Sequence, residues 1–244
     1  MTDKRLSHVM EHARTIGLKP KTIFDIGYNT GTPGLYNIFK DVEYIIVEPL
    51  EESKVFMEYA IKELEKASYY IAAAGPFSGE TNVYISPLDG RSSIIQHVGP
   101  ERIVPMVTLD QIAEEKGTQG PYIIKIDTQG YEIEILKGAT IVLKETEYIV
   151  LEISLFPFSG VPVFDEVIAY MKSKGFTAYD FFNFNYRPID GALGQIDIVF
   201  VHDNGLFKQR KSFRTKEQRE KNVQKKLEGR AKALEQIKLG TKFI

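Results

Sequence analysis

Short apolar runs alternate along the chain with segments of helical periodicity, and this alternation constrains the fold more than any other feature. The runs show no regular polar and apolar alternation, which is typical of strands buried on both faces of a parallel sheet. The expected strands are 22–26, 44–49, 69–74, 122–127, 148–153, 176–182 and 195–202. The expected helices are 1–17, one beginning at Pro33, 51–66, 109–116, 131–144 and 163–174. The pattern predicts an α/β fold with seven strands.

The remaining segments are less regular. Residues 75–106 are expected to form an irregular excursion with one extra strand near 82–86, and 154–162 and 183–194 are expected to be loops. A charged helix is expected over 214–239. We therefore expect a main domain over 1–205 and a basic helical tail over 206–244.

Charge is unevenly distributed between these two parts. The tail holds 13 Lys/Arg against 4 Asp/Glu, whereas residues 1–205 hold 18 against 29. Because nucleic-acid binders gain affinity from clustered cations, the acidic body argues against a nucleic-acid partner. The tail alone leaves that option open. The preferred interpretation is a solvated amphipathic helix that makes contacts between copies of the chain or docks on the main domain.

Composition excludes several other classes. The absence of Cys rules out disulfides and thiolate chemistry, and no apolar run approaches the ~20 residues of a membrane span. The first residues show no secretory pattern, so a cytoplasmic protein is expected. The four His residues have no metal-ligand grouping.

A glycine-rich turn follows the first expected strand. Its sequence is Asp25-Ile26-Gly27-Tyr28-Asn29-Thr30-Gly31, and a helix is expected directly after it. Such a turn lets the backbone approach a nucleotide-like ligand, but the spacing departs from G-x-G-x-x-G and so disfavours a pyrophosphate. Asp25 is expected at the mouth of the loop, where its charge suits a sulfonium or an amino group. A turn needed only for packing is the alternative.

Two further features bear on the ligand. Glu48 ends the second strand, where a carboxylate can accept hydrogen bonds from ribose hydroxyls, although a solvated strand-end acid is equally compatible with the pattern. The chain has no G-x-x-x-x-G-K-[ST] segment, which excludes a P-loop.

The third motif is Lys125-Ile126-Asp127-Thr128-Gln129-Gly130-Tyr131-Glu132, followed by Leu136-Lys137-Gly138-Ala139. With the glycine-rich turn and Val47-Glu48-Pro49, it resembles the FkbM family of S-adenosylmethionine-dependent methyltransferases, whose members carry K-I-D-x-[QE]-G-x-E and then L-x-G-A. The resemblance also takes in Ala73-Ala74-Gly75, Ser92-Ser93, Thr108-Leu109-Asp110 and Leu151-Glu152-Ile153, and covers residues 18–203. Tyr28 and the Thr32-Pro33-Gly34 turn depart from the family pattern.

The resemblance implies a Rossmann-like, mostly parallel seven-stranded sheet of the class I methyltransferase type with an antiparallel last hairpin. It implies S-adenosylmethionine as the cofactor and a hydroxyl oxygen of a saccharide or other small molecule as the acceptor. The implied cofactor residues are Asp25, Gly27, Tyr28, Asn29 and Gly31 at the methionine moiety, Glu48 and Pro49 at the ribose, Ala73 and Ala74 at the adenine, and Asp127 at the reacting centre.

Methyl transfer to oxygen gains from in-line positioning and from a base that removes the hydroxyl proton. The candidate bases are Asp127, which we prefer, Glu132, Glu152 and His97. For Glu132 and Glu152 a buried structural carboxylate is the alternative, and for His97 a surface loop residue. Asp197 and these acids are compatible with a divalent cation, but no spacing demands one.

Specificity residues are expected in the two irregular loops. The candidates combine rings able to stack on a sugar with groups that form hydrogen bonds: Phe156, Phe158, Asn183, Asn185, Tyr186 and Arg187. Aromatic loops that only cover the core are equally compatible with this pattern. Two other functions remain open, a nicotinamide-dependent oxidoreductase on a similar sheet and a non-enzymatic scaffold or nucleic-acid-binding module built on the basic tail.

Overall fold

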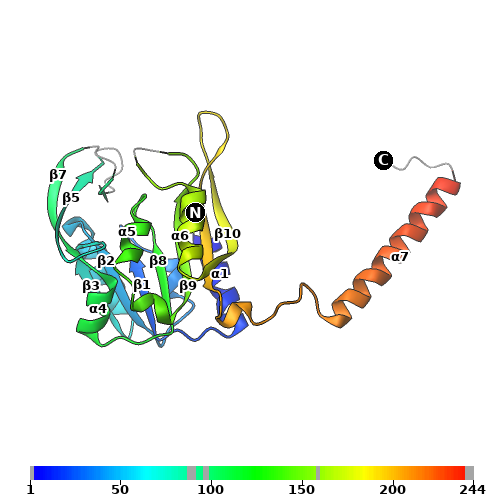
Figure 1. Cartoon of the computed structure of the whole chain (residues 1–244), viewed down its shortest axis with the longest axis horizontal. Helices are drawn as coiled ribbons and strands as arrows, with labels where there is room; N and C mark the ends of the chain where they lie inside the picture. The colour runs from blue at the N-terminus through cyan, green and yellow to red at the C-terminus, as the bar shows by residue number, and fades with distance from the viewer. Residues whose placement is uncertain (1–2, 87–91, 96–98, 158–159, 240–244) are drawn as a thin grey trace. The chain divides into compact units, whose positions relative to one another are not determined.

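The computed structural model describes residues 3–86, 92–95, 99–157 and 160–239, and the chain divides into two compact units, 1–208 and 209–244. The first unit is built on a seven-stranded sheet in the order β10-β11-β9-β8-β1-β2-β3 (Figure 1). Its strands are β1 Thr22–Ile26, β2 Glu43–Glu48, β3 Ala67–Ile71, β8 Tyr122–Ile126, β9 Thr146–Ser154, β10 Phe176–Tyr186 and β11 Leu193–His202. Strands β3, β2, β1, β8 and β9 are parallel, and β11 runs antiparallel to both β9 and β10. The expected sheet and its antiparallel last hairpin are confirmed.

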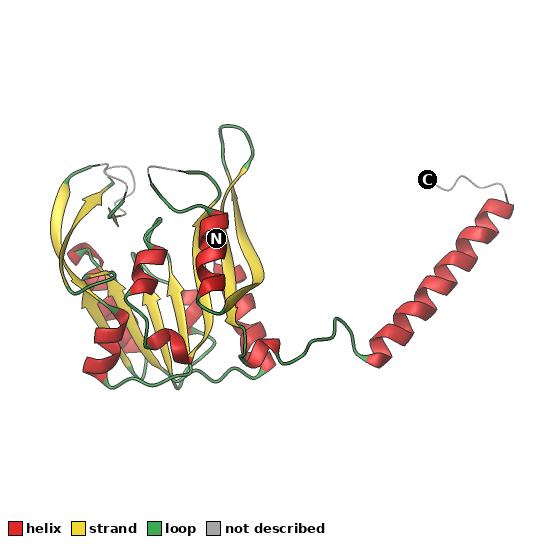
Figure 2. Ribbon diagram, in the orientation of Figure 1, coloured by secondary structure: helices red, strands yellow, loops and turns green. Residues whose placement is uncertain are grey.

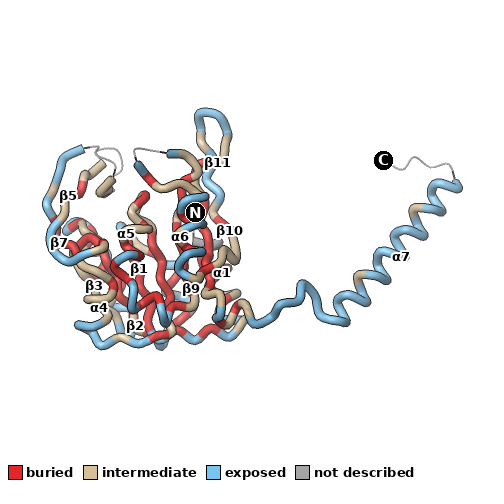
Figure 3. Tube along the Cα trace, in the orientation of Figure 1, coloured by how far each residue is buried: buried red, intermediate tan, exposed pale blue. Residues whose placement is uncertain are grey.

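Helices cover both faces of this sheet (Figure 2). The helices of the first unit are α1 Asp3–Ile16, α2 Pro33–Tyr36, α3 Lys54–Glu63, α4 Leu109–Lys116, α5 Glu132–Lys137 and α6 Phe164–Ser173, with short 3₁₀ turns at Glu51–Ser53, Val142–Glu145 and Leu206–Lys208. One face packs on α4, α5 and α6, and the opposite face packs on α1 and α2. Every residue of β1 and β8 is therefore buried, as Figure 3 shows for the centre of the sheet.

A second sheet lies among the described residues between 73 and 107, and the sequence predicted only one of its strands, the one near 82–86. Its strands are β4 Ala73–Ala74, β5 Gly79–Ile85, β6 Ser92–Ser93 and β7 Glu101–Val107, in the order β4-β7-β5-β6. The expected strand 69–74 is thus divided, because Ala73 and Ala74 pair with β7 instead of continuing β3. Exposed and buried residues mix along β7, and Pro105 lies within it, which hid it from a search for continuous apolar runs.

Two other expected boundaries were wrong. The helix expected over 131–144 ends at Lys137, since Gly138 closes it before the separate turn at Val142–Glu145. The loop expected over 183–194 shrinks because β10 continues to Tyr186 and β11 begins at Leu193. A long hairpin therefore replaces the expected loop.

The second unit consists mainly of α7, Lys216–Lys238. Thr215 caps it: its Oγ1 accepts from the Gln218 N–H at 3.2 Å, and its own N–H donates to Gln218 Oε1 at 3.0 Å. No described residue of α7 is buried, and Val223, Leu227, Leu234 and Ile237 are exposed. Among the described residues of the whole chain, no helix combines the length and the apolar character that crossing a bilayer requires.

Candidate functional site

A cavity of about 560 Å³ lies at the carboxyl ends of β1, β2, β8 and β9. The second sheet contributes to its wall through β4, β5 and β6, and the last hairpin contributes through β10 and β11. In open α/β sheets, ligands bind in the crevice outside the carboxyl ends of the strands. The volume falls in the range of small-molecule sites, ~300–1,000 Å³.

The glycine-rich turn and Glu48 form one end of the cavity. Glu48 accepts the N–H of Asn29 at 2.8 Å on Oε2 and the N–H of Leu50 at 3.1 Å on Oε1. Burial raises the pKa of the Glu48 carboxyl, although these two donors oppose the shift. Gly27 has a φ of +77°, and a Cβ there would lie 2.0 Å from the Asp127 carbonyl oxygen. The turn is therefore fixed by backbone contacts that only glycine permits.

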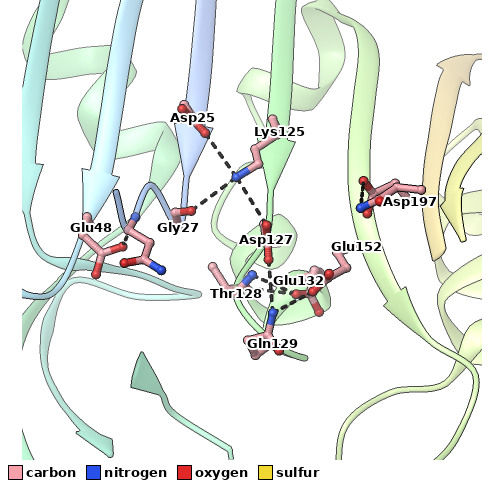
Figure 4. Close-up of polar contacts among 12 residues, drawn as sticks. Asp25, Gly27, Glu48, Lys125, Asp127, Thr128, Gln129, Glu132, Glu152 and Asp197 are labelled. Atoms are coloured by element: carbon pink, nitrogen blue, oxygen red, sulfur yellow. Dashed lines mark hydrogen bonds and ion pairs between the residues drawn. The ribbon is translucent and has the colours of Figure 1, made fainter. Parts of the chain in front are cut away.

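In the strands that lead to the turn, Asp25 of β1 and Lys125 of β8 form a buried ion pair. The two residues are partners in the parallel register of β1 and β8, and Lys125 Nζ lies 3.4 Å from Asp25 Oδ1. Lys125 Nζ also donates to the Gly27 carbonyl at 3.2 Å and lies 3.7 Å from Asp127 Oδ2 (Figure 4). Tyr36 donates its hydroxyl to Asp25. Burial opposes the charge of Lys125, but Asp25 and Asp127 outweigh it and raise the pKa of the ammonium.

Three carboxyl groups lie in the cavity beside this ion pair. Asp127 follows β8, Glu152 lies on β9 and Asp197 on β11. Gln129 joins the first two, because its Nε2 donates to Glu152 Oε2 at 2.6 Å and to Asp127 Oδ1 at 3.2 Å (Figure 4). Gln195 Nε2 donates to the same Glu152 oxygen at 3.3 Å.

The protonation of these acids is shifted by their surroundings. Burial, followed by the charges of Asp127 and Asp197, raises the pKa of Glu152 to about 9. Burial and the charge of Asp127 raise the pKa of Asp197 to about 7, while Asn183 and Lys125 oppose that shift. Perturbed carboxyl groups in a cleft are typical of functional sites.

Glu132 has a different environment. Its Oε1 accepts the N–H groups of Thr128 and Gly130 and the Thr128 hydroxyl, at 3.2, 3.0 and 3.2 Å. Its side chain is buried and does not line the large cavity. Burial raises the pKa of the Glu132 carboxyl against these donors. Glu132 therefore holds the turn after β8 in shape, which corresponds to the structural alternative and does not support a role as base.

Most residues expected at the cofactor do line the cavity. They are Gly27, Tyr28, Asn29, Gly31, Glu48, Pro49, Ala73, Ala74 and Asp127. Asp25 is the exception, since its side chain is fully buried and does not reach the cavity wall. The expectation that Asp25 sits at the mouth of the loop is wrong, because its partner in the sheet register, Lys125, holds it between the strands.

The expected acceptor residues divide into two groups. Asn183 and Asn185 line the cavity, as does Phe184 between them. Phe156, Tyr186 and Arg187 do not line it; the Arg187 guanidinium stacks 4.0 Å from the Phe156 ring centroid and pairs with Asp190 at 2.9 Å. His97 and Phe158 lie outside the described residues.

Sequence reasoning missed several polar residues of the cavity. Lys125, Gln129 and Gln195 were not assigned a role, and Asp197 was considered only as a cation ligand. A signal for two of them exists in the last strand, where Gln195 and Asp197 alternate with Ile196 and Ile198. Within the described part of the chain, no cluster of three or more His, Asp or Glu side chains is arranged to hold a metal ion.

Comparison with known proteins identifies the family. The family described as "Methyltransferase FkbM domain" matches residues 25–178, and no curated protein matches the chain. A Methanococcus jannaschii fibrillarin pre-rRNA processing protein is 15% identical with a TM-score of 0.48, covering 79% of this chain and 74% of its own. The Burkholderia thailandensis 1,6-didemethyltoxoflavin-N1-methyltransferase, with bound 1,6-didemethyltoxoflavin and S-adenosylhomocysteine, is 11% identical with a TM-score of 0.44, covering 81% of this chain and 76% of its own.

The family match includes both motifs that build the cavity, from Asp25 in β1 to the segment after β8, and it covers more than half of the chain. The resemblance drawn from those motifs is thereby confirmed. This chain belongs to the FkbM methyltransferase family and is an S-adenosylmethionine-dependent methyltransferase.

Proposed function

We propose that this enzyme methylates a hydroxyl oxygen of a saccharide or another small polyhydroxylated acceptor. The observation that carries the proposal is the convergence, in one cavity, of the glycine-rich turn with Glu48 at one end and a group of carboxyl and amide side chains at the other. The first set suits the methyl donor, and the second suits an uncharged acceptor rich in hydroxyl groups.

The charges in the cavity fit S-adenosylmethionine. Among the described lining residues, the one Lys or Arg side chain is Lys125, and its charge is matched by Asp25 and Asp127. A pyrophosphate lacks a free cationic partner there, whereas the positive charge of S-adenosylmethionine finds the carboxylate of Asp127. When bound, the cofactor supplies an electrophilic methyl group. Glu48 would hold its ribose, with its own orientation fixed by the N–H groups of Asn29 and Leu50.

The acceptor end of the cavity fits hydroxyl groups. Amide side chains there form two hydrogen-bonded pairs: Asn183 Nδ2 donates to Asp197 Oδ2 at 3.1 Å, and Asn185 Nδ2 donates to Gln195 Oε1 at 3.1 Å. Such side chains both donate to and accept from hydroxyl groups. Phe184, 43% exposed, lines the same region and offers a ring against which the apolar face of a sugar can stack. The chain's contribution to rate would then be to hold donor and acceptor in line and to exclude water.

The donor site is tested by calorimetry with S-adenosylhomocysteine. The Glu48→Ala variant should bind it about 10- to 100-fold more weakly, because two or more hydrogen bonds to a charged group are lost. Glu43→Ala, at the opposite end of the same strand, is the matched control and should bind like the wild type. Equal affinity of the Glu48 variant and the wild type would remove Glu48 from the site.

The acceptor class is tested with a methyl-labelled donor and a panel of sugars, aminosugars and phenols. The proposal predicts label in a neutral polyhydroxylated acceptor, with the new methyl group on oxygen by NMR of the product. Transfer exclusively to nitrogen or carbon would overturn the proposed acceptor while leaving the methyltransferase identity intact.

A further inference from the structure

Two carboxyl groups face each other across neighbouring strands inside the cavity. Glu152 on β9 and Asp197 on β11 are direct partners in the antiparallel register, and both line the cavity. Like charges placed directly opposite each other destabilise a sheet. An arrangement in which one acid stays protonated while the other ionises relieves this repulsion.

Strained backbone positions hold this pair. The non-glycine residues with positive φ in the described chain are Asn29, Gln129 and Asn183, at +49°, +59° and +51°, and all three line the cavity. Asn183 sits where the β10–β11 register shifts between Phe182 and Asn185. Its Nδ2 donates to Asp197 Oδ2 at 3.1 Å, and Gln129 Nε2 donates to Glu152 Oε2 at 2.6 Å. Each such conformation costs about 1–3 kcal/mol and is typical of functional sites.

The two acids have different protonation at neutral pH. With a pKa raised to about 9 by burial and by Asp127 and Asp197, Glu152 keeps its proton. Asp197 faces Glu152, Asp127 and Lys125, and with a pKa raised to about 7 it takes up or releases a proton near neutrality. A general base is most effective when its pKa lies near the working pH.

Asp127, the base preferred from the sequence, is held differently. Its Oδ2 lies 3.7 Å from the buried ammonium of Lys125, and its Oδ1 accepts from Gln129 at 3.2 Å. Both carboxyl oxygens of Asp127 are therefore already engaged, one by Lys125 and the other by Gln129. Asp127 is thus suited to balance the charge of Lys125 and of a bound cation.

We propose that Asp197 is the catalytic proton acceptor, with Glu152 beside it as a neutral hydrogen-bonding group, an assignment that rests on the methyl transfer to oxygen proposed above. The acceptor oxygen forms a bond to the methyl carbon as the carbon–sulfur bond breaks, and the electron pair of that bond goes to sulfur. The hydroxyl proton passes to the carboxylate of Asp197. Gln129 and Asn183 act as positioning residues: Gln129 orients the carboxyl group of Glu152, and Asn183 orients that of Asp197.

The assignment is tested with amide variants of nearly equal shape, assayed with a hydroxyl acceptor. Asp197→Asn should lower kcat by about 10²- to 10³-fold, and the rise of activity with pH around neutrality should disappear. Glu152→Gln should lose about tenfold or less and keep that rise, because a neutral hydrogen-bonding group is retained. Asp203→Asn, just after β11 and paired with Lys172 at the surface, is the matched control and should behave like the wild type. An Asp197→Asn enzyme that retains wild-type kcat and its pH dependence overturns the assignment.

A second measurement does not require an acceptor or a folded variant. The carboxyl carbons of ¹³C-labelled wild-type protein, saturated with S-adenosylhomocysteine, are titrated by NMR. We expect Glu152 to be protonated at pH 7 and Asp197 to titrate near neutrality. An Asp197 midpoint below about 5, within the ordinary range for Asp, overturns the assignment. If the wild type transfers label to no hydroxyl acceptor, the proposed function fails, and the titration still decides whether Asp197 takes up a proton near pH 7.

Discussion

The two ends of the cavity are built by different kinds of contact. At the cofactor end, backbone groups set the shape: Glu48 is held by two N–H groups, and the Gly27 carbonyl accepts from Lys125. At the acceptor end, side chains hold side chains, as Gln129 and Gln195 do with Glu152.

This difference has a consequence for what each end tolerates. Backbone contacts around the glycine-rich turn leave no room for an added side-chain atom, so a Cβ at Gly27 disrupts this end as a whole. Side chains that contact each other from separate strands can be substituted one at a time, so specificity can change without loss of the fold. We therefore expect substitutions at the cofactor end to act mainly on stability and cofactor affinity, and those at the acceptor end mainly on catalysis and specificity.

The largest effect is expected for Gly27→Ala. A Cβ at this position meets the Asp127 carbonyl oxygen at 2.0 Å, and the φ of +77° is itself unfavourable for alanine. We expect the free energy of unfolding to fall by at least about 4 kcal/mol, measured by urea denaturation. Gly31→Ala is the comparison, because its φ of +135° is also unfavourable for alanine but its new Cβ would contact side-chain atoms only at 3.5 Å or more, so the pair isolates the effect of the clash at Gly27. Equal losses in the two variants would contradict the backbone account of this end.

Asp25→Ala is expected to rank next. The substitution leaves the buried Lys125 ammonium with Asp127 alone and removes the acceptor of the Tyr36 hydroxyl. The loss should be about 3 kcal/mol, because the buried ammonium loses its nearer counter-charge. Asp25→Ala combined with Lys125→Met should lose less than the sum of the single changes by urea denaturation. Strict additivity would show that the ion pair does not stabilise the turn.

A smaller effect, dependent on pH, is expected for Glu152→Gln. The pKa of Glu152 is raised from 4.5 to about 9, so the folded protein keeps a proton that the unfolded chain has released. Because of this difference in pKa, the free energy of unfolding of the wild type falls as pH rises from about 4.5 to 9. The variant has no titrating group at this position and lacks this pH dependence. The stability of the variant relative to the wild type should therefore increase steadily between pH 5 and pH 9. Thermal melts at several pH values check this, and a difference independent of pH would contradict it.

The smallest effect is expected for Asn185→Ala. Its Nδ2 donates to Gln195 Oε1 at 3.1 Å near the rim of the cavity, and the residue is exposed. The KM for the acceptor should rise by about five- to tenfold, corresponding to one hydrogen bond, while the affinity for S-adenosylhomocysteine stays constant. Steady-state kinetics and calorimetry together separate the two ends. If Asn185→Ala weakened the affinity for S-adenosylhomocysteine and left the KM for the acceptor unchanged, Asn185 would not belong to the acceptor end.

The same division explains what could be predicted from the sequence. The glycine-rich turn, Glu48 and the Lys125-Ile126-Asp127 motif are contiguous segments, and their neighbours in the sheet follow from the parallel order of buried strands. The pairing of Glu152 with Asp197 depends on the antiparallel register of strands 45 residues apart, which periodicity does not determine. For this reason Asp197 was missed as a base candidate.

The burial of Asp25 was misjudged for a similar reason. A charged residue at the end of a strand suggests a ligand contact, whereas the parallel register of β1 and β8 brings Lys125 alongside it. Apart from the strand near 82–86, the second sheet was missed because its other strands are short or, as in β7, mix exposed and buried positions. Local pattern thus identifies central strands well and peripheral ones poorly.

The second sheet begins beside the cavity and returns to it. Its first strand carries Ala73 and Ala74, its last strand pairs with them, and Ser92 and Ser93 of β6 line the cavity wall. Because β4 directly follows β3 and β7 leads into α4, the intervening residues can vary in length without changing any pairing in the seven-stranded sheet. We therefore expect that the segment from β4 to β7 can be replaced by the corresponding segment of a relative. Such an exchange would change the wall of the cavity while the seven-stranded sheet and its acidic residues stay in place.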